Sequence, residues 1–194
     1  GIVHNNEHVF VNIWQEGLHR LQSDTLFPIV SGYKTRKQEI LFSFPYDTSR
    51  ILVGTDKNRL YLFDGMKLEP YRLKNHSYLE EGILSGGNNI SSRYFALSTL
   101  AGGVVMIDKA SRKMAFTINY QTGLPDDEVI AMATDRNQGL WISHASGLTR
   151  VALDLPVRNF TTYPGLKGKP TQTAEIGNTL YLATGEGVFR LQEE

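Results

Sequence analysis

The longest run of carboxylates in this sequence is Asp126, Asp127 and Glu128. Consecutive residues of an extended loop point in different directions, so the three side chains do not form the facing pair that general acid–base catalysis uses. We interpret the run as a solvated loop, because polar connecting segments lie at the protein surface. The alternative is a contact with a ligand or with a hard cation, which carboxylate oxygens coordinate.

The five histidines are scattered, and only His4 and His8 lie close together in the sequence. Their i, i+4 spacing would place two imidazoles on one face of a helix, as in a metal pair. The surrounding residues predict strand and turn instead, so we expect no metal site. No cysteine is present, which excludes disulfides and thiolate ligands. No phosphate-binding glycine loop, nucleophile elbow or zinc-protease motif occurs in the sequence. We therefore expect that the chain binds no cofactor, has no catalytic residue and is not an enzyme.

Composition narrows the classes of partner. The 194 residues are 41% hydrophobic and 21% charged, and 20 basic residues balance 20 acidic ones. This is the composition of a globular chain, and it lacks the basic excess that binding to nucleic acid or to an anionic membrane needs. No apolar run is long enough to cross a bilayer, so a membrane partner would act only through an anchor outside this chain. The chain begins with Gly1 rather than Met, and we expect a piece of a longer protein.

These residues belong to a repeat. Five segments share one pattern, an apolar strand, a tight polar turn and a second apolar strand, and the residues just before the second strand are Gly17, Arg59, Gly103, Gly147 and Gly187. They recur at intervals of 40 to 44 residues, the period of β-propeller blades. Glycine suits a tight turn because it adopts positive φ without steric cost. Arg59 departs from the pattern and indicates a different turn geometry.

The predicted fold class is therefore all-β, a β-propeller array of about five four-stranded blades that forms a partial propeller or fragment. The approximate blade boundaries are 1–32, 33–74, 75–120, 121–163 and 164–194. The fourth repeat is the clearest, with strands at 129–134, 140–143 and 148–151 and a fourth strand near 158–162.

The ends of such an array raise an energetic problem. Bare end faces would forfeit on the order of 8 kcal/mol each. We therefore expect the array to close as a small ring, to self-associate through its end blades, or to continue in further blades.

In a propeller, the loop after the second strand of each blade borders one mouth of the central channel. The residues at these positions are Gln15, Thr55, Leu100, His144 and Thr184. A ring of such residues is the predicted ligand site, and for each of them an ordinary hairpin turn is the alternative. Trp14 and Trp141 could stack on a sugar. Their position in the second strand favours inter-blade core instead.

One repeat carries a family resemblance. Its motif comprises residues 122–129, Asp135, residues 139–142 and residues 146–150. The order Gly-Leu-Pro, Val, Asp, Gly-Leu-Trp-Ile, Gly-Leu and Arg closely resembles the two-component regulator propeller repeat. Residues 165–168, 180–184 and 187–188 look like a degenerate last copy, whereas 33–55 and 82–103 fit only at the second strand and turn.

The resemblance implies a periplasmic or extracellular sensor region of a bacterial signalling receptor. Its partner would be a small molecule or a carbohydrate, and its anchor and output domains would lie outside this chain. The alternatives are a structural or interaction propeller that mediates receptor dimerisation and a carbohydrate-active propeller enzyme. Fold alone does not decide among them.

Overall fold

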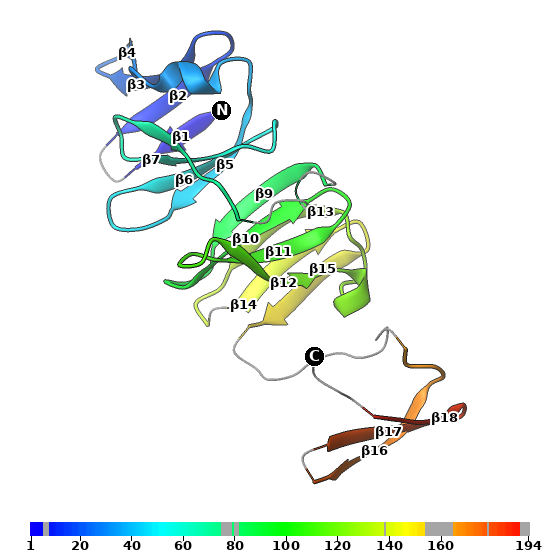
Figure 1. Cartoon of the computed structure of the whole chain (residues 1–194). Helices are drawn as coiled ribbons and strands as arrows, with labels where there is room; N and C mark the ends of the chain where they lie inside the picture. The colour runs from blue at the N-terminus through cyan, green and yellow to red at the C-terminus, as the bar shows by residue number, and fades with distance from the viewer. Residues whose placement is uncertain are drawn as a thin grey trace.

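The computed structural model describes residues 1–5, 8–74, 79, 82–137, 139–153, 165–177 and 179–190. They form five small antiparallel sheets, each built from strands that follow one another in the sequence (Figure 1). The helical segments of these residues include two short 3₁₀ turns, η1 (Gly32–Thr35) and η2 (Tyr120–Thr122). The predicted all-β propeller class is confirmed.

The sheets are named here as first to fifth blade, in chain order. The first contains β1 (Ile2–His4), β2 (Val9–Ile13), β3 (Gly17–Gln22) and β4 (Thr25–Pro28). The second contains β5 (Ile40–Pro45), β6 (Ile51–Thr55), β7 (Leu60–Phe63) and β8 (Leu68–Pro70). The third contains β9 (Leu84–Asn89), β10 (Tyr94–Thr99), β11 (Gly103–Asp108) and β12 (Lys113–Ile118). The fourth contains β13 (Val129–Thr134), β14 (Gly139–His144) and β15 (Gly147–Ala152), and the fifth contains β16 (Pro170–Ile176), β17 (Thr179–Thr184) and β18 (Gly187–Arg190). The strand expected near 158–162 lies outside the described residues.

Turn chemistry explains the hairpins between the second and third strands. All four glycines that the repeat singled out have positive φ: Gly17, Gly103, Gly147 and Gly187. In the second blade the positive φ, 53°, falls on Asn58 rather than on Arg59. Asparagine is one of the few side chains that tolerate this region, so the different turn geometry expected around Arg59 is confirmed.

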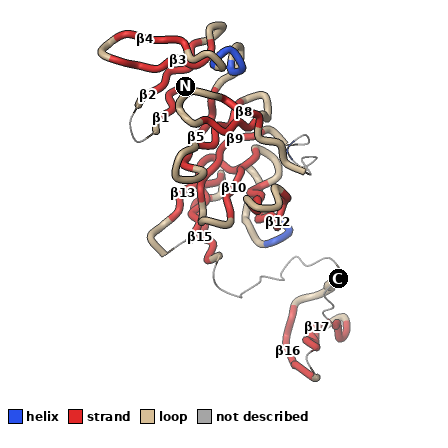
Figure 2. Tube along the Cα trace, turned by 60° about the vertical axis from the view of Figure 1, so that its left-hand side comes forward, coloured by secondary structure: helices blue, strands red, loops and turns tan. Residues whose placement is uncertain are grey.

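The first four blades stack in chain order. Their first strands, β1, β5, β9 and β13, lie next to one another, and Figure 2 shows the four sheets following one another along the stack. Successive side chains of a strand point to opposite faces, so each central blade contributes to two clusters of buried apolar side chains, one with each neighbour. The fifth blade lies apart from this stack (Figure 1).

Hydrogen bonds between blades accompany the apolar packing. Asn12 in the first blade donates its Nδ2 to the carbonyl of Gln38, at 2.9 Å. The Lys109 ammonium in the third blade donates to the carbonyl of Tyr46 in the second, at 3.1 Å. Ser85 in the third blade donates its Oγ to the carbonyl of Val129 in the fourth, at 3.2 Å. Because buried polar groups are costly unless they are paired, these bonds fix how one blade sits on the next.

Candidate functional site

The residues predicted to border the propeller mouth occupy two kinds of position. Thr55, His144 and Thr184 are the last residues of β6, β14 and β17. Gln15 and Leu100 lie in the turns that follow β2 and β10. Within the described residues, no hydrogen bond joins any two of the five side chains. The strand-terminal counterparts of Thr55 in the first and third blades are Ile13 and Thr99.

Thr55 belongs to a buried polar network between the first two blades. Its side chain is fully buried, and Oγ1 donates to Oε1 of Gln38 at 2.8 Å. Nε2 of Gln38 in turn donates to the carbonyl of Lys34 at 2.6 Å. A satisfied network of this kind holds a unique packing, and here it fixes the second blade against η1.

His144 combines burial with an unpaired ring nitrogen. The residue is 4% exposed, and Nε2 lies 2.8 Å from Oγ1 of Thr149. Its Nδ1 is buried and has no hydrogen-bond partner among the described residues. Of the other predicted residues, Leu100 is 44% exposed and Gln15 is exposed with φ 71°. Thr184 is half-buried and accepts a hydrogen bond from the amide of Glu186 at 3.1 Å.

The two tryptophans are not in the inter-blade core, so that prediction is wrong. Trp14 is 59% exposed and lies beyond the end of β2. Trp141 is 37% exposed, because its neighbours Leu140 and Ile142 take the face of β14 that packs on the third blade. Nε1 of Trp141 donates to Oδ2 of Asp135 at 3.1 Å. Trp141 therefore lies on the outer face of the fourth blade.

Asp135 closes the Asx turn that the sequence predicted. Its Oδ1 accepts hydrogen bonds from the amides of Asn137 and Gly139, at 2.9 and 2.8 Å. Its Oδ2 accepts from Nε of Arg150 at 2.7 Å. The Arg150 bond and the Gly139 amide together hold the pKa of this carboxyl well below its usual range. Asp135 is thus a turn-stabilising anion.

Two carboxylates of the acidic run bind amides near their own loop. Oδ1 of Asp126 accepts from the amide of Glu128 at 3.0 Å, and Oδ1 of Asp127 accepts from the amide of Tyr120 at 2.6 Å. Among the described residues, no group of three or more His, Cys, Asp or Glu side chains could hold a metal ion.

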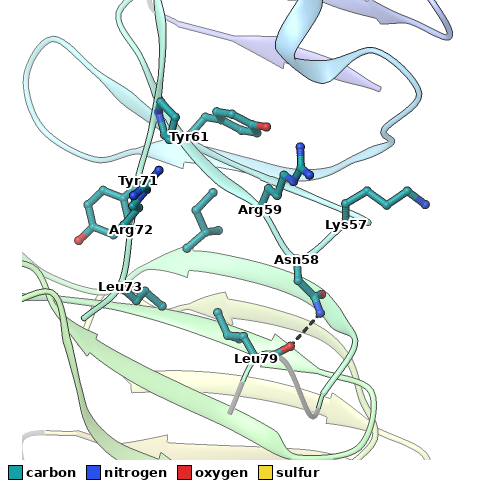
Figure 3. Close-up of a pocket in the computed structure, with 10 residues that line it drawn as sticks. Lys57, Asn58, Arg59, Tyr61, Tyr71, Arg72, Leu73 and Leu79 are labelled. Atoms are coloured by element: carbon teal, nitrogen blue, oxygen red, sulfur yellow. Dashed lines mark hydrogen bonds between the residues drawn. The ribbon is translucent and has the colours of Figure 1, made fainter. Parts of the chain in front are cut away.

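A cavity that the sequence did not predict opens beside the second blade. It has a volume of about 610 Å³ and lies between β7, the segment that follows β8, and Leu79 (Figure 3). It is lined by Lys57, Asn58, Arg59, Leu60, Tyr61, Pro70, Tyr71, Arg72, Leu73 and Leu79. This volume lies within the usual range of small-molecule sites.

The cavity has an apolar floor of buried side chains. Leu60, Leu73 and Leu79 are each less than a tenth exposed and belong to the apolar cluster between the second and third blades. Asn58 ties the β6–β7 turn to the chain that enters the third blade. Its Nδ2 donates to the carbonyls of Leu79 and Gly82, at 2.8 and 3.1 Å, and its Oδ1 accepts from the amide of Leu84 at 2.9 Å. The bond to Leu79 is the dashed line in Figure 3.

The charged groups at the cavity are predominantly cationic. Nζ of Lys57 lies 3.0 Å from Oδ2 of Asp56. Burial raises the pKa of Asp56, but the backbone amide of Glu39 and the Lys57 ammonium outweigh it and lower the pKa overall. Asp56 therefore neutralises Lys57. Arg59 and Arg72 are exposed, and neither guanidinium has a hydrogen-bond or ion-pair partner among the described residues.

One departure from the repeat pattern falls at this cavity. Arg59 stands where the other four repeats have glycine. That departure accounts for the unusual turn, and it also places a cation at the cavity. The other lining residues of the same repeat segment are Lys57, Asn58, Leu60 and Tyr61, whereas residues 70–73 and Leu79 lie outside the repeated strand–turn–strand pattern and carry no recognisable motif.

Comparisons with known proteins place the fold. No protein-family model matches the chain, and no curated protein is similar to it in sequence. Among solved structures, it is similar to the extracellular domain of BT4673 from B. thetaiotaomicron, a proposed one-component system, with a TM-score of 0.63, 13% identity and 98% of this chain covered. It is also similar to the extracellular domain of BT3049 from the same organism, a proposed hybrid two-component system, with a TM-score of 0.58, 18% identity and 100% coverage.

A third match comes from outside these signalling systems. The WD40 β-propeller domain of Doa1 superposes on the whole chain with a TM-score of 0.58 and 10% identity. At such identities the likeness establishes the fold, so this chain is a β-propeller array.

In particular, the array resembles the extracellular propeller domains of B. thetaiotaomicron one- and two-component systems over nearly its entire length. It spans only 29% and 26% of those two chains. No helix in the described ranges has the length and hydrophobicity needed to span a bilayer.

Proposed function

We propose that this chain is an extracytoplasmic, non-catalytic, ligand-sensing domain of a bacterial two-component or related signal-transduction receptor. The observation that carries the proposal is the likeness to the BT4673 and BT3049 extracellular domains across 98% and 100% of the chain. The sequence resemblance of residues 122–150 to the two-component regulator propeller repeat points independently to the same class.

The cavity beside the second blade supports a sensing role. Its wall is shared between the second blade and Leu79, which packs in the apolar cluster between the second and third blades. A ligand in this cavity would contact both sides of a blade junction. Binding would then favour whichever arrangement of the two blades holds the ligand best, and differential affinity of this kind drives a conformational response.

A non-catalytic role is consistent with how the carboxylates are used. Asp47, Asp64 and Asp108 each accept hydrogen bonds from backbone amides of their own turns. Burial raises the pKa of Asp47, but Arg50 and the turn amides lower it to about 2. Such groups serve turns and are poor proton donors near neutral pH.

Thermal unfolding in the presence of soluble oligosaccharides and related solutes tests the proposal. A ligand at 100 times its Kd stabilises a folded protein by about 2.7 kcal/mol, which for this size of chain raises Tm by roughly 5 to 10 °C. We expect one ligand class to give such a shift without being consumed. A panel with no shift would contradict the sensor, and turnover of a glycan would support a carbohydrate-active propeller enzyme instead.

A second candidate function is an interaction propeller that self-associates through its end blades. The register pairs Ile2 with Val11, Val9 with Leu21, and Leu21 with Leu26 on one face of the first blade. Among these, Ile2 is 71% exposed. The equivalent face of the second blade supplies Ile51 and Val53 to the core.

On the fifth blade, the face that would pack on a following blade carries Ile176 and Val188, and both side chains are exposed. Head-to-tail contact between the first blade of one copy and the fifth blade of another would repeat the blade-on-blade packing. Sedimentation of the chain across a concentration series tests this, with Val9→Lys as the disrupting variant. Association that Val9→Lys abolishes supports this second function, whereas a monomer at every concentration contradicts it.

A further inference from the structure

We propose that the cavity beside the second blade binds a small organic anion, one whose carboxylate, sulfate or phosphate group is held by Arg59 and Arg72. The inference rests on the proposed sensing function and deepens it, because it names the chemical class of the ligand. The body of the ligand would lie on the floor formed by Leu60, Leu73 and Leu79.

The described lining of the cavity has an excess of positive charge. None of the described lining residues has a carboxylate, whereas three of them are cations: Lys57, Arg59 and Arg72. The carboxylate beside the cavity, Asp56, is already paired with Lys57 at 3.0 Å and with the amide of Glu39 at 2.8 Å. Two positive charges, those of Arg59 and Arg72, therefore remain without a counter-ion among the described residues.

The two remaining cations, Arg59 and Arg72, are both guanidinium groups. A guanidinium is always charged and presents a planar fork of donors, which matches the oxygens of carboxylate, sulfate and phosphate groups. Arg59 follows the β6–β7 turn, and Arg72 follows β8 from the other side of the cavity (Figure 3). An anion could thus be bound from two segments of the same blade, one before β7 and one after β8.

The apolar floor would contact the body of the ligand. Leu60, Leu73 and Leu79 are 5%, 7% and 4% exposed, so they are held in the apolar packing between the second and third blades. Fixed apolar walls with a few placed polar groups are typical of small-molecule sites. Close to such a floor the effective dielectric is lower than in water, which strengthens an ion pair with either guanidinium. A bare inorganic anion would use the two cations and leave the floor uncovered.

Calorimetric titration of the full chain with four sugars of matched size tests the inference. Glucuronate, glucose 6-sulfate and glucose 6-phosphate carry the three anionic groups, and glucose is the neutral reference. We expect at least one anion to bind at least tenfold more tightly than glucose, with an affinity that falls as salt is added. The anion that binds most tightly shows whether the cavity prefers a carboxylate, a sulfate or a phosphate group.

Two variants and a matched control complete the design. Arg59→Gln and Arg72→Gln should each weaken the best anion by about tenfold, the effect of losing one charge-assisted hydrogen bond. Arg136→Gln removes the same charge from an exposed turn of the fourth blade and should leave the affinity unchanged. Since all three arginines are exposed, circular dichroism should confirm an unchanged fold.

Several outcomes would overturn the inference. Glucose binding as tightly as the anions would do so, and so would equal weakening by Arg59→Gln and Arg136→Gln. If no anion binds while a neutral oligosaccharide raises Tm, the anion inference fails and the sensing function stands. If neither the anions nor any oligosaccharide binds, both proposals fail together.

Discussion

The junction between the second and third blades and the outer face of the fourth blade are built from the same repeated strands, yet they differ sharply in burial. At the junction, Leu52, Phe95 and Leu97 are fully buried. On the outer face of the fourth blade, Ile130 and Leu148 are 64% and 62% exposed. The comparison teaches that the strand pattern makes both faces of a blade apolar, and that only a neighbouring blade turns an apolar face into core.

The largest expected effect is the difference in stability lost when a large side chain is replaced by alanine on each of these two faces. Phe95→Ala removes a fully buried ring that packs against Phe44 and Tyr71, and should destabilise the chain by about 3–5 kcal/mol. Leu148→Ala on the exposed face should change stability by less than about 0.5 kcal/mol. Urea unfolding measures both, and similar losses for the two variants would mean that the outer face is covered.

A second effect concerns close approach between blades. A Cβ on Gly87 of the third blade would collide with the Phe42 ring of the second. Gly87→Ala should therefore cost about 1–3 kcal/mol through overpacking. Gly185→Ala is the matched control, because no atom of the described residues, apart from Gly185 and its chain neighbours, lies within 4 Å of its Cβ position.

Shortening the facing side chain should restore part of this loss. In the Phe42→Leu background, Gly87→Ala should be better tolerated than in the parent chain. If Gly87→Ala and Gly185→Ala unfold at the same urea concentration, the two blades do not pack as closely as described.

A smaller effect is expected from losing the Asn58 hydrogen bonds that connect the second blade to the chain entering the third. Asn58→Ala loses the hydrogen bonds to Leu79, Gly82 and Leu84 and should cost about 1–2 kcal/mol. Hydrogen exchange at the Leu84 amide should accelerate in this variant, because its acceptor is gone. Asn137→Ala, in an exposed turn of the fourth blade, should leave that amide unchanged. Unaltered protection of Leu84 in Asn58→Ala would show that the tie is dispensable.

The smallest effect is a dependence on pH. The amide and hydroxyl of Ser111, together with Arg93, lower the pKa of Asp108 from 3.8 to about 2. Because the folded pKa is depressed, the stabilisation is present above about pH 4, the unfolded value, and is lost as pH falls toward 2. The urea midpoint should decline over this window, and less steeply in Asp108→Asn. Parallel declines in the two proteins would contradict the assignment to Asp108.

The sequence predicted those features that repeat in every blade. Four turn glycines, the Asx turn of Asp135 and the first three strands of the fourth blade follow from local chemistry, which one chain segment determines by itself. The position of Trp141 was predicted wrongly because its burial depends on whether a further blade covers it. The cavity could not be predicted, since Arg59 and Arg72 belong to one blade whereas Leu79 reaches it from the connection to the next.

The account is tested most directly by hydrogen exchange of the full chain with and without saturating glucuronate, or the best anion if another binds more tightly. It predicts added protection in peptides that contain Arg59, Arg72 and Leu84, because the ligand would contact both sides of that blade junction. Protection confined to the acidic run at residues 126–128 or to His144, or no change anywhere in the chain, would contradict it.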